Sequence, residues 1–462
     1  MNILRNTIIK PLLVLCSVVV IFISCDDFVQ ADLPDSQLTA PAVFEDKATA
    51  TSAMTNIYSK IRDYGILSGA SNGLSHTLGI YTDELTYFGT GASATDFYTN
   101  SLTGSDTELK ALWTTSYNQI YAANAIIHGV THSKSLSSAD RNLLKGEALF
   151  IRALLHFYLT NLYGNVPYIA TTDYVANSKV TRMPVEAIYS LVKTDLNEAI
   201  SLLPQDYLSS GRTRPNVYTA HALLARVNLY MGLWAEASNE ATAVLNHTQR
   251  YAMTSIDATF KMGSSATIWQ LSPALATYNT EEGSTFIFAS GPPPRSALSS
   301  ALLLSFETND LRKSHWIKGV SDVATTWYYS FKYKKSRTDG TSDERSILFR
   351  LEEQYLIRAE ARAQQGELTG AKEDLNRIRN RAGLGNTTAG NKEEILMAII
   401  EERRHELFTE LGHRFFDLKR TNGLSSALTP LKPGWDATDL LFPLPDSELL
   451  LNPNLKPQNP GY

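Results

Sequence analysis

The chain has 462 residues, of which 43% are hydrophobic and 19% are charged, a balance typical of a globular protein rather than a disordered one. A net charge of −5 and the lack of a basic stripe argue against nucleic acid as a partner. The only two cysteines, Cys16 and Cys25, lie close to the N-terminus, so a chain that begins at Cys25 can form no intrachain disulfide.

The N-terminal residues are typical of a lipoprotein signal peptide. Arg5 and Lys10 are followed by an apolar run, residues 12–23, which is too short to span a bilayer as a stable helix. The run ends in FISC, a lipobox-like sequence in which Cys25 is the expected site of lipidation. An ordinary secretory signal is the alternative. We expect a signal peptide at residues 1–24, a lipidated tether at 25–46 and a single domain at 47–462.

Hydrophobic periodicity predicts a mainly α-helical fold. Helices are expected at residues 47–64, 109–130, 139–163, 184–203, 217–231, 234–247, 347–364 and 368–381, and another begins near Lys392. Small residues recur in two of the helix pairs with the spacing of a tetratricopeptide unit, in which small side chains let antiparallel helices approach closely. They are Ala225, Gly232, Ala237, Ala359, Gly366 and Ala371. These patterns predict a helical-repeat body at about 109–247 and 347–381.

Two segments interrupt the helical pattern and are expected to form a loop-rich half. Residues 65–106 are predicted to be a long loop, and residues 250–345 contain short strand-like runs at 268–271, 286–288 and 326–333. The basic run from Lys332 to Arg337 alternates with aromatic residues, as expected for a strand with one solvated face. The last segment, residues 440–462, contains five prolines and is expected to be extended over the surface.

The most densely charged segment is residues 401–420, EERRHELFTELGHRFFDLKR. Arg403 lies on the apolar face of the predicted helix, so we expect a buried ion-pair lattice in which Glu402, Glu406 and Glu410 supply its carboxylates. Gly412 is predicted to end this helix in a left-handed cap. A catalytic or metal-binding role for Glu402, His405 and Glu406 is the alternative, but the spacing is not that of HExxH.

Catalytic motifs are otherwise missing. The chain contains no GxSxG, P-loop or HExxH motif, and we predict no enzymatic activity, cofactor or metal site. His128 and His132 could share a helix face, but no third ligand is near them in the sequence. The acidic pair Asp83–Glu84 could serve a glycosidase, although one pair among 47 acidic residues is weak evidence.

Binding is better supported, because aromatic side chains that stack on sugar rings occur within the two loop-rich segments. Polar side chains close to them could read hydroxyl groups. The candidate ligand-binding residues are Tyr87, Phe88, Phe97, Tyr98, Asn100, Tyr278, Arg295 and Trp327. The alternative is that most of these aromatic residues belong to the hydrophobic core.

Several blocks of the sequence resemble the SusD/RagB family of outer-membrane nutrient-uptake lipoproteins. The segment EERRHELFTELGHRFFDLKR is similar to one family block, and LFPLPDSELLLNPNLKPQNPGY is similar to the family's C-terminal block. LWTTSYNQIYAANAII and ALFIRALLHFYLTNLYGNVP resemble further blocks, so the resemblance extends over the whole chain. It implies a tetratricopeptide-like body, with four helix pairs, that supports a loop-rich binding half.

The resemblance also implies a function. A family member would be anchored in the outer membrane through Cys25, face the cell exterior and cap a SusC-like TonB-dependent transporter. It would capture an oligosaccharide, or a peptide as in RagB-like members, without acting as an enzyme. The glycan-contacting positions of the family do not lie in these matching blocks, so the resemblance identifies no ligand-contacting residue in this sequence. A scaffold that holds the transporter without touching a ligand is a further alternative.

Overall fold

The computed structural model describes residues 40–208 and 211–462. The predicted signal peptide, Cys25 and most of the predicted tether lie outside the described residues. Residues Phe44–Tyr462 form one compact unit, which follows the short helix α2 (Ala40–Val43). Within the part of the chain that the structure describes, no helix combines the length and apolar character needed to cross a membrane.

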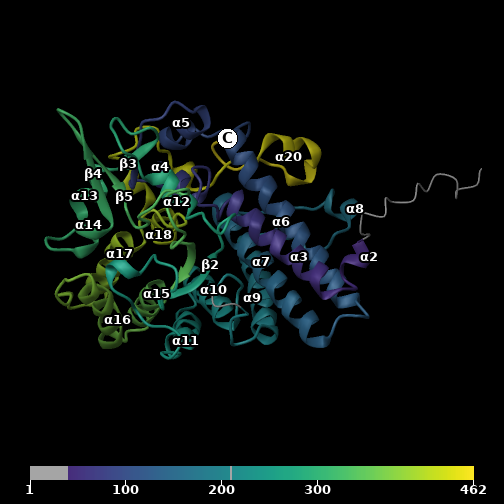
Figure 1. The fold of residues 1–462 in the computed structure, drawn as a ribbon. Coiled ribbons are helices and arrows are strands. Elements are labelled where there is room, and N and C mark those ends of the chain that lie inside the picture. Colours follow the sequence, from purple (N-terminus) through teal and green to yellow (C-terminus); the bar gives the residue numbers. More distant parts are fainter. Residues whose placement is uncertain (1–39, 209–210) are drawn as a thin grey trace, which may run out of the picture. The chain divides into compact units, whose positions relative to one another are not determined.

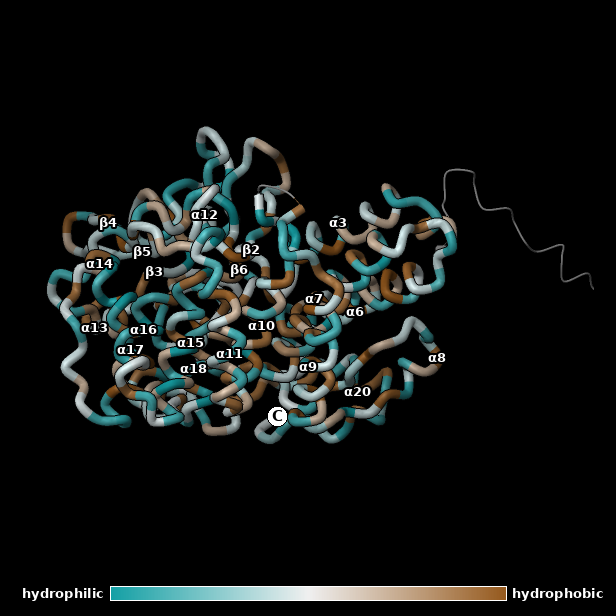
Figure 2. Tube along the Cα trace, turned by 90° about the horizontal axis from the view of Figure 1, so that it is seen from below, coloured by the Kyte–Doolittle hydropathy of each residue, from teal (hydrophilic) through white to brown (hydrophobic). Residues whose placement is uncertain are grey.

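The long helices confirm the sequence prediction closely (Figure 1). They are α3 (Lys47–Asp63), α6 (Thr107–His132), α7 (Ser138–Tyr163), α9 (Val185–Leu202), α10 (Val217–Tyr230), α11 (Trp234–Leu245), α15 (Leu351–Gln364), α16 (Leu368–Arg381) and α17 (Lys392–Leu407). Capping side chains fix several of their starts, since Asp46, Ser137 and Asn391 each accept a hydrogen bond from a backbone N–H of the first turn. In Figure 2 hydrophobic and hydrophilic residues alternate along these helices, the pattern expected of amphipathic elements.

The small residues lie where the tetratricopeptide-like pattern places them. Ala225 and Ala237 are completely buried between α10 and α11, and Ala359 and Ala371 are buried between α15 and α16. Gly232 and Gly366 occupy the turns of the two pairs with φ of 71° and 85°. Glycine adopts this left-handed conformation without a steric penalty. The two pairs share one hydrophobic cluster, so the repeats stack.

Helix α7 lies at the centre of the body. It packs between α6 and α9, and it is buried on all sides from Gly146 to Tyr163. A helix that is buried all round must satisfy its polar side chains internally. Arg152 therefore pairs with Asp195 of α9 at 2.6 Å, and Glu147 pairs with Arg214 at 2.7 Å.

Three two-stranded antiparallel sheets are present in the described residues. They pair β1 (Leu85–Tyr87) with β3 (Ser296–Leu298), β2 (Thr267–Leu271) with β6 (Ser346–Arg350), and β4 (Ile317–Ser321) with β5 (Thr326–Ser330). Strand β3 also lies against β5. Both views place β3, β4 and β5 together with α13 (Ser300–Ser305) and α14 (Leu311–His315), at a distance from α3 and α6 (Figures 1 and 2).

The prediction of a long loop over residues 65–106 was wrong. This segment forms α4 (Leu74–Tyr81), β1 and α5 (Ala92–Thr99). Helix α4 is buried along its whole length, which the Gly- and Ser-rich composition around it did not indicate. The C-terminal segment likewise contains a short helix, α20 (Asp446–Leu451), within an otherwise irregular course.

Two strand predictions and one helix start also need correction. Residues 286–288 are not a strand, because Phe286 ends helix α12 (Glu281–Phe286). Strand β5 stops at Ser330, so the basic run beyond it is not a solvated strand face. Lys332 is instead buried, and its ammonium pairs with Glu410 at 2.5 Å. The segment predicted as the start of helix 347–364 belongs to β6 up to Arg350.

The predicted ion-pair lattice is confirmed and centres on Glu406. The guanidinium groups of Arg312, Arg350 and Arg381 all lie within 3.1 Å of its carboxylate. Burial alone would raise the pKa of Glu406, but the three guanidinium groups hold it well below its usual range. The lattice ties α17 to β6, α14 and α16, so it stabilises the fold.

The predicted partners of Arg403 were wrong. Its Nε donates to Asp417 of α18 (His413–Arg420) at 2.7 Å rather than to a glutamate of its own helix. Residues 402 and 406 share a helix face, whereas residue 403 is turned about 100° away and faces α18. The helix also ends at Leu407, earlier than expected. Gly412, with φ of 73°, begins α18 instead of capping α17.

Candidate ligand-binding site

The two segments that were expected to carry the binding residues meet in the sheet formed by β1 and β3. Tyr87 is opposite Ser296, and the N–H of Phe88 donates to the carbonyl of Arg295 at 2.7 Å. The sequence predicted both segments but not their pairing, because the two strands are separated by more than 200 residues. This pairing places Tyr87, Phe88 and Arg295 at one site.

Two further aromatic residues join this site. The ring of Tyr98 lies 6.3 Å from that of Tyr87 at 48°, and the Nζ of Lys432 lies 3.8 Å from its centroid. Trp327 of β5 packs on the loop before β3, where a Cβ added to Gly291 would lie only 2.0 Å from its ring. We call Tyr87, Phe88, Tyr98, Arg295 and Trp327 the aromatic edge.

The side chains of the aromatic edge are accessible to different degrees. Phe88 is 41% exposed and Arg295 is exposed, whereas Tyr87, Tyr98 and Trp327 are half-buried. The hydroxyl of Tyr87 accepts a hydrogen bond from the N–H of Gly91 at 3.1 Å, which fixes its ring. Half-buried rings with restricted freedom form a preorganised stacking surface.

Phe97 and Asn100 do not belong to this surface. Phe97 is completely buried, with its ring 5.5 Å from Phe442 and 6.1 Å from Tyr81. Asn100 is buried as well and caps α5 in the left-handed conformation, donating to the carbonyl of Tyr81 at 3.2 Å. Because α5 is a helix and not a loop, successive residues point in different directions. Phe97 faces the core while Tyr98 does not.

Among the described residues, Tyr278 packs against an arginine rather than against another aromatic ring. The guanidinium carbon of Arg337 lies 4.7 Å from the centroid of its ring. Arg337 is held in turn by Glu281 at 2.8 Å. This Tyr–Arg–Glu arrangement stabilises the loop before α12.

The residues considered for catalysis have structural partners. Asp83 is buried and pairs with both Arg404 and Arg414 at 2.8 Å. The ring of His405 packs on Phe306. Burial, and to a lesser extent the neighbouring arginines, lower the pKa of His405 to about 3, so its imidazole stays neutral. The rings of His128 and His132, one turn apart on α6, lie 4.3 Å from each other at an angle of 34°. Within the described residues no three His, Cys, Asp or Glu side chains converge to hold a metal ion.

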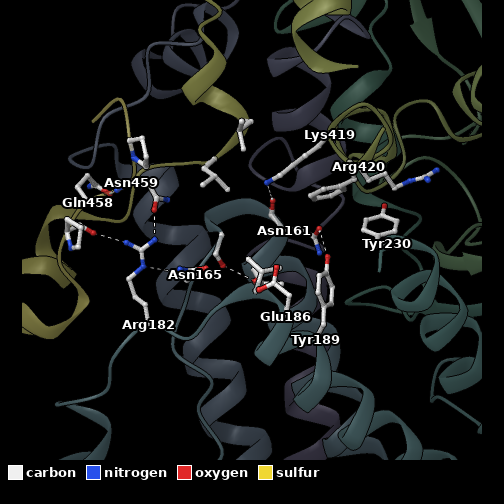
Figure 3. A pocket seen from close by; sticks show the side chains of 18 of the residues that line it. Asn161, Asn165, Arg182, Glu186, Tyr189, Tyr230, Lys419, Arg420, Gln458 and Asn459 are labelled. Atoms are coloured by element: carbon white, nitrogen blue, oxygen red, sulfur yellow. Dashed lines mark hydrogen bonds between the residues drawn. The ribbon is translucent and has the colours of Figure 1, made fainter. Parts of the chain in front are cut away.

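A second feature, which the sequence did not predict, is a cavity of about 1010 Å³ (Figure 3). The end of α7, the start of α9 and helix α18 form its walls, and the C-terminal segment covers it. Arg182 holds the C-terminal segment in place, because its guanidinium donates hydrogen bonds to the carbonyl of Pro457 at 2.7 Å and to the side chain of Asn459. No sequence pattern marks the cavity, since its lining comes from distant parts of the chain.

A helical-repeat body thus supports the β1–β3 sheet and the half-buried aromatic rings next to it. Two family models match the chain: a SusD-like model described as starch-binding and associating with the outer membrane, over residues 34–229, and the SusD family model, over residues 304–462. The chain therefore belongs to the SusD/RagB family, whose members are binding proteins.

Individual relatives agree with this assignment. SusD-like protein P2 of Formosa agariphila is 27% identical over 428 residues, which cover 77% of this chain and 81% of that protein. The crystal structure of a SusD superfamily protein from Parabacteroides distasonis has a TM-score of 0.79 at 22% identity, covering 92% of this chain and 100% of that one. A laminarin-binding SusD-like protein has a TM-score of 0.73 at 22% identity, covering 90% and 99%. The mainly α, tetratricopeptide-like fold is thus confirmed.

Proposed function

We propose that this protein is a surface-exposed lipoprotein that captures an oligosaccharide at the aromatic edge and delivers it to a SusC-like TonB-dependent transporter. The observation that supports capture is the pairing of β1 with β3, which brings Tyr87 and Phe88 next to the exposed Arg295 in the sheet. Tyr98 packs against Tyr87, and Trp327 packs on the loop before β3. In this proposal Cys25 carries the lipid anchor and residues 25–46 are the tether to the outer membrane.

The chemistry of the aromatic edge suits a sugar chain. Flat rings stack on the apolar C–H faces of pyranoses, and a guanidinium such as that of Arg295 donates several hydrogen bonds to hydroxyl groups. Phe88 has no hydroxyl that would need a partner and is the most exposed ring of the set.

Isothermal titration of the purified protein against a panel of neutral oligosaccharides and short peptides tests the proposal. We expect at least one oligosaccharide to bind, and the substitutions Phe88→Ala and Trp327→Ala each to weaken it by about tenfold. Tyr174→Ala is a matched control, because Tyr174 is a 79% exposed aromatic on α8 (Tyr174–Asn177). If only peptides bind, the ligand is a peptide and the proposal of oligosaccharide capture is wrong.

Delivery is tested separately. The protein should co-purify with a SusC-like transporter from outer membranes, and Cys25→Ala should release it from the membrane. If uptake of the identified sugar is unchanged in the Phe88→Ala, Trp327→Ala double variant while the complex stays intact, the protein is a scaffold and the capture proposal fails.

A further inference from the structure

The cavity beneath the C-terminal segment carries positive charge that the protein itself does not neutralise. Arg182, Lys419, Arg420 and Lys456 line it, whereas Glu186 is the one acidic side chain among its described lining residues. The guanidinium of Arg420 is saturated, since it pairs with Glu360 and with Asp417 at 2.8 Å. The other three cations form no ion pair with any described carboxylate.

Lys419 is the cation best placed to receive a ligand. Its ammonium group reaches into the cavity from α18 and donates to the backbone carbonyl of Asn161 at 2.6 Å (Figure 3). An ammonium group has three donors, so two of them are left for a ligand. A partly buried charge with one neutral partner is costly, and an anion in the cavity would offset that cost.

The remaining walls suit a ring-shaped molecule. The rings of Tyr189, Tyr230 and Phe416 line the same cavity. Tyr189 is held by a hydrogen bond from its hydroxyl to the side chain of Asn161 at 3.0 Å, whereas the hydroxyl of Tyr230 forms none with the described residues. The cavity volume of about 1010 Å³ is at the upper end of the range for small-molecule pockets, about 300–1,000 Å³, so the cavity can hold a ligand of the size of a sugar.

We infer that this cavity is a binding site for an acidic sugar, with Lys419 pairing with the anionic group and Tyr189 and Tyr230 contacting the ring. The site is separate from the aromatic edge, to which none of its lining residues belongs. A uronate-containing chain would thus be recognised differently from a neutral one. This inference does not depend on oligosaccharide capture at the aromatic edge.

Titration of the whole protein with glucuronate, with glucose and with glucose 6-sulfate tests the assignment. Glucuronate should bind, and glucose, which lacks the charge, should bind at least about tenfold more weakly. Glucose 6-sulfate, which carries its charge on a sulfate, should also bind more tightly than glucose, and equal affinity for all three sugars would overturn the role of the charge. Failure of glucuronate to bind would overturn the inference as a whole.

Variants connect binding to the cavity. Lys419→Met should weaken glucuronate binding by about tenfold, and Lys419→Arg should retain most of it. Lys456→Gln, at an exposed position that does not threaten folding, should weaken it by about twofold. Phe88→Ala and Trp327→Ala should have no effect, so this inference and the proposed function can fail independently. Wild-type affinity in both Lys419→Met and Lys456→Gln would contradict the site.

The pH dependence provides a readout that a structural role would not change. Burial lowers the pKa of Lys419 to about 7, so the side chain is charged at pH 6 and largely neutral at pH 8. Glucuronate should therefore bind up to about tenfold more tightly at pH 6, and this preference should vanish in Lys419→Met. Burial raises the pKa of Tyr189 and Tyr230, which stay protonated throughout this range. The other charged groups that face the cavity are Arg182, Glu186, Arg420 and Lys456. A pH-independent affinity would contradict the role of Lys419.

Discussion

The ion-pair lattice around α17 and the aromatic edge around β1 and β3 use polar and aromatic residues in opposite ways. In the lattice, the buried carboxylate of Glu406 is paired with three guanidinium groups, so its charge is compensated within the protein. At the aromatic edge, rings that could have entered the core remain half-buried or exposed. Charge density therefore marks the part that holds the fold together, whereas incomplete burial of apolar rings marks the part to which we assign binding in the proposed function.

The largest effect should come from breaking the lattice at its centre. Replacing Glu406 by Gln leaves three buried guanidinium groups around a neutral side chain, and we expect a loss of about 3–5 kcal/mol of unfolding free energy. Glu401→Gln is the matched control on the same helix, because the Glu401 side chain is 51% exposed and should change stability by less than about 0.5 kcal/mol. Urea denaturation measures both. Equal stability of the two variants would show that the lattice does not brace the body.

Phe97 and Phe88 sharpen the comparison within one short stretch of chain. Phe97→Ala removes a completely buried ring and should destabilise the protein by about 3–5 kcal/mol. Phe88→Ala removes a ring that is 41% exposed and should cost far less, about 1 kcal/mol or below, while it weakens sugar binding. Thermal melts and titrations of both variants separate the two roles. A stable Phe97→Ala variant that has lost binding would return Phe97 to the ligand site.

Glu282 shows what a buried carboxylate does without arginine neighbours. Ser346 donates to it at 2.6 Å, it forms no ion pair with the described residues, and burial raises its pKa to about 7. Because the folded-state pKa lies above the unfolded value, its contribution to stability is present below about pH 4.5 and is lost as the pH rises through 7. Up to about 3 kcal/mol is lost in this window, and Glu282→Gln should remove that part of the pH dependence. Identical stability–pH curves for variant and wild type would contradict this.

The helical body could be predicted from sequence because its signals are local. Periodicity, capping residues and the small residues of two helix pairs placed the long helices within a few residues of their observed ends. Where prediction failed, the determinants were distant. Helix α4 has no clear helical periodicity, and tertiary contacts bury its residues. Arg403 pairs with Asp417 because the chain turns back after Leu407, which brings α18 next to α17.

The site was predicted only in part. The aromatic composition of the two loop-rich segments indicated the candidate residues Tyr87, Phe88, Tyr98, Arg295 and Trp327. Which rings face the core depends on the secondary structure of these segments, and composition does not determine it. Phe97 and Asn100 were misjudged for that reason. The cavity with Lys419 could not be predicted, because its lining is assembled from α7, α9, α18 and the C-terminal segment.

The central claim is that binding falls to the aromatic edge while the lattice only braces the body. The most direct measurement is the dissociation constant of the best-binding oligosaccharide for three proteins: the wild type, Trp327→Ala and Glu406→Gln, each with its melting temperature. We predict about tenfold weaker binding for Trp327→Ala, with a melting temperature close to that of the wild type. For Glu406→Gln we predict a lower melting temperature but unchanged binding below it. Undiminished binding by a folded Trp327→Ala, Phe88→Ala double variant would contradict the claim.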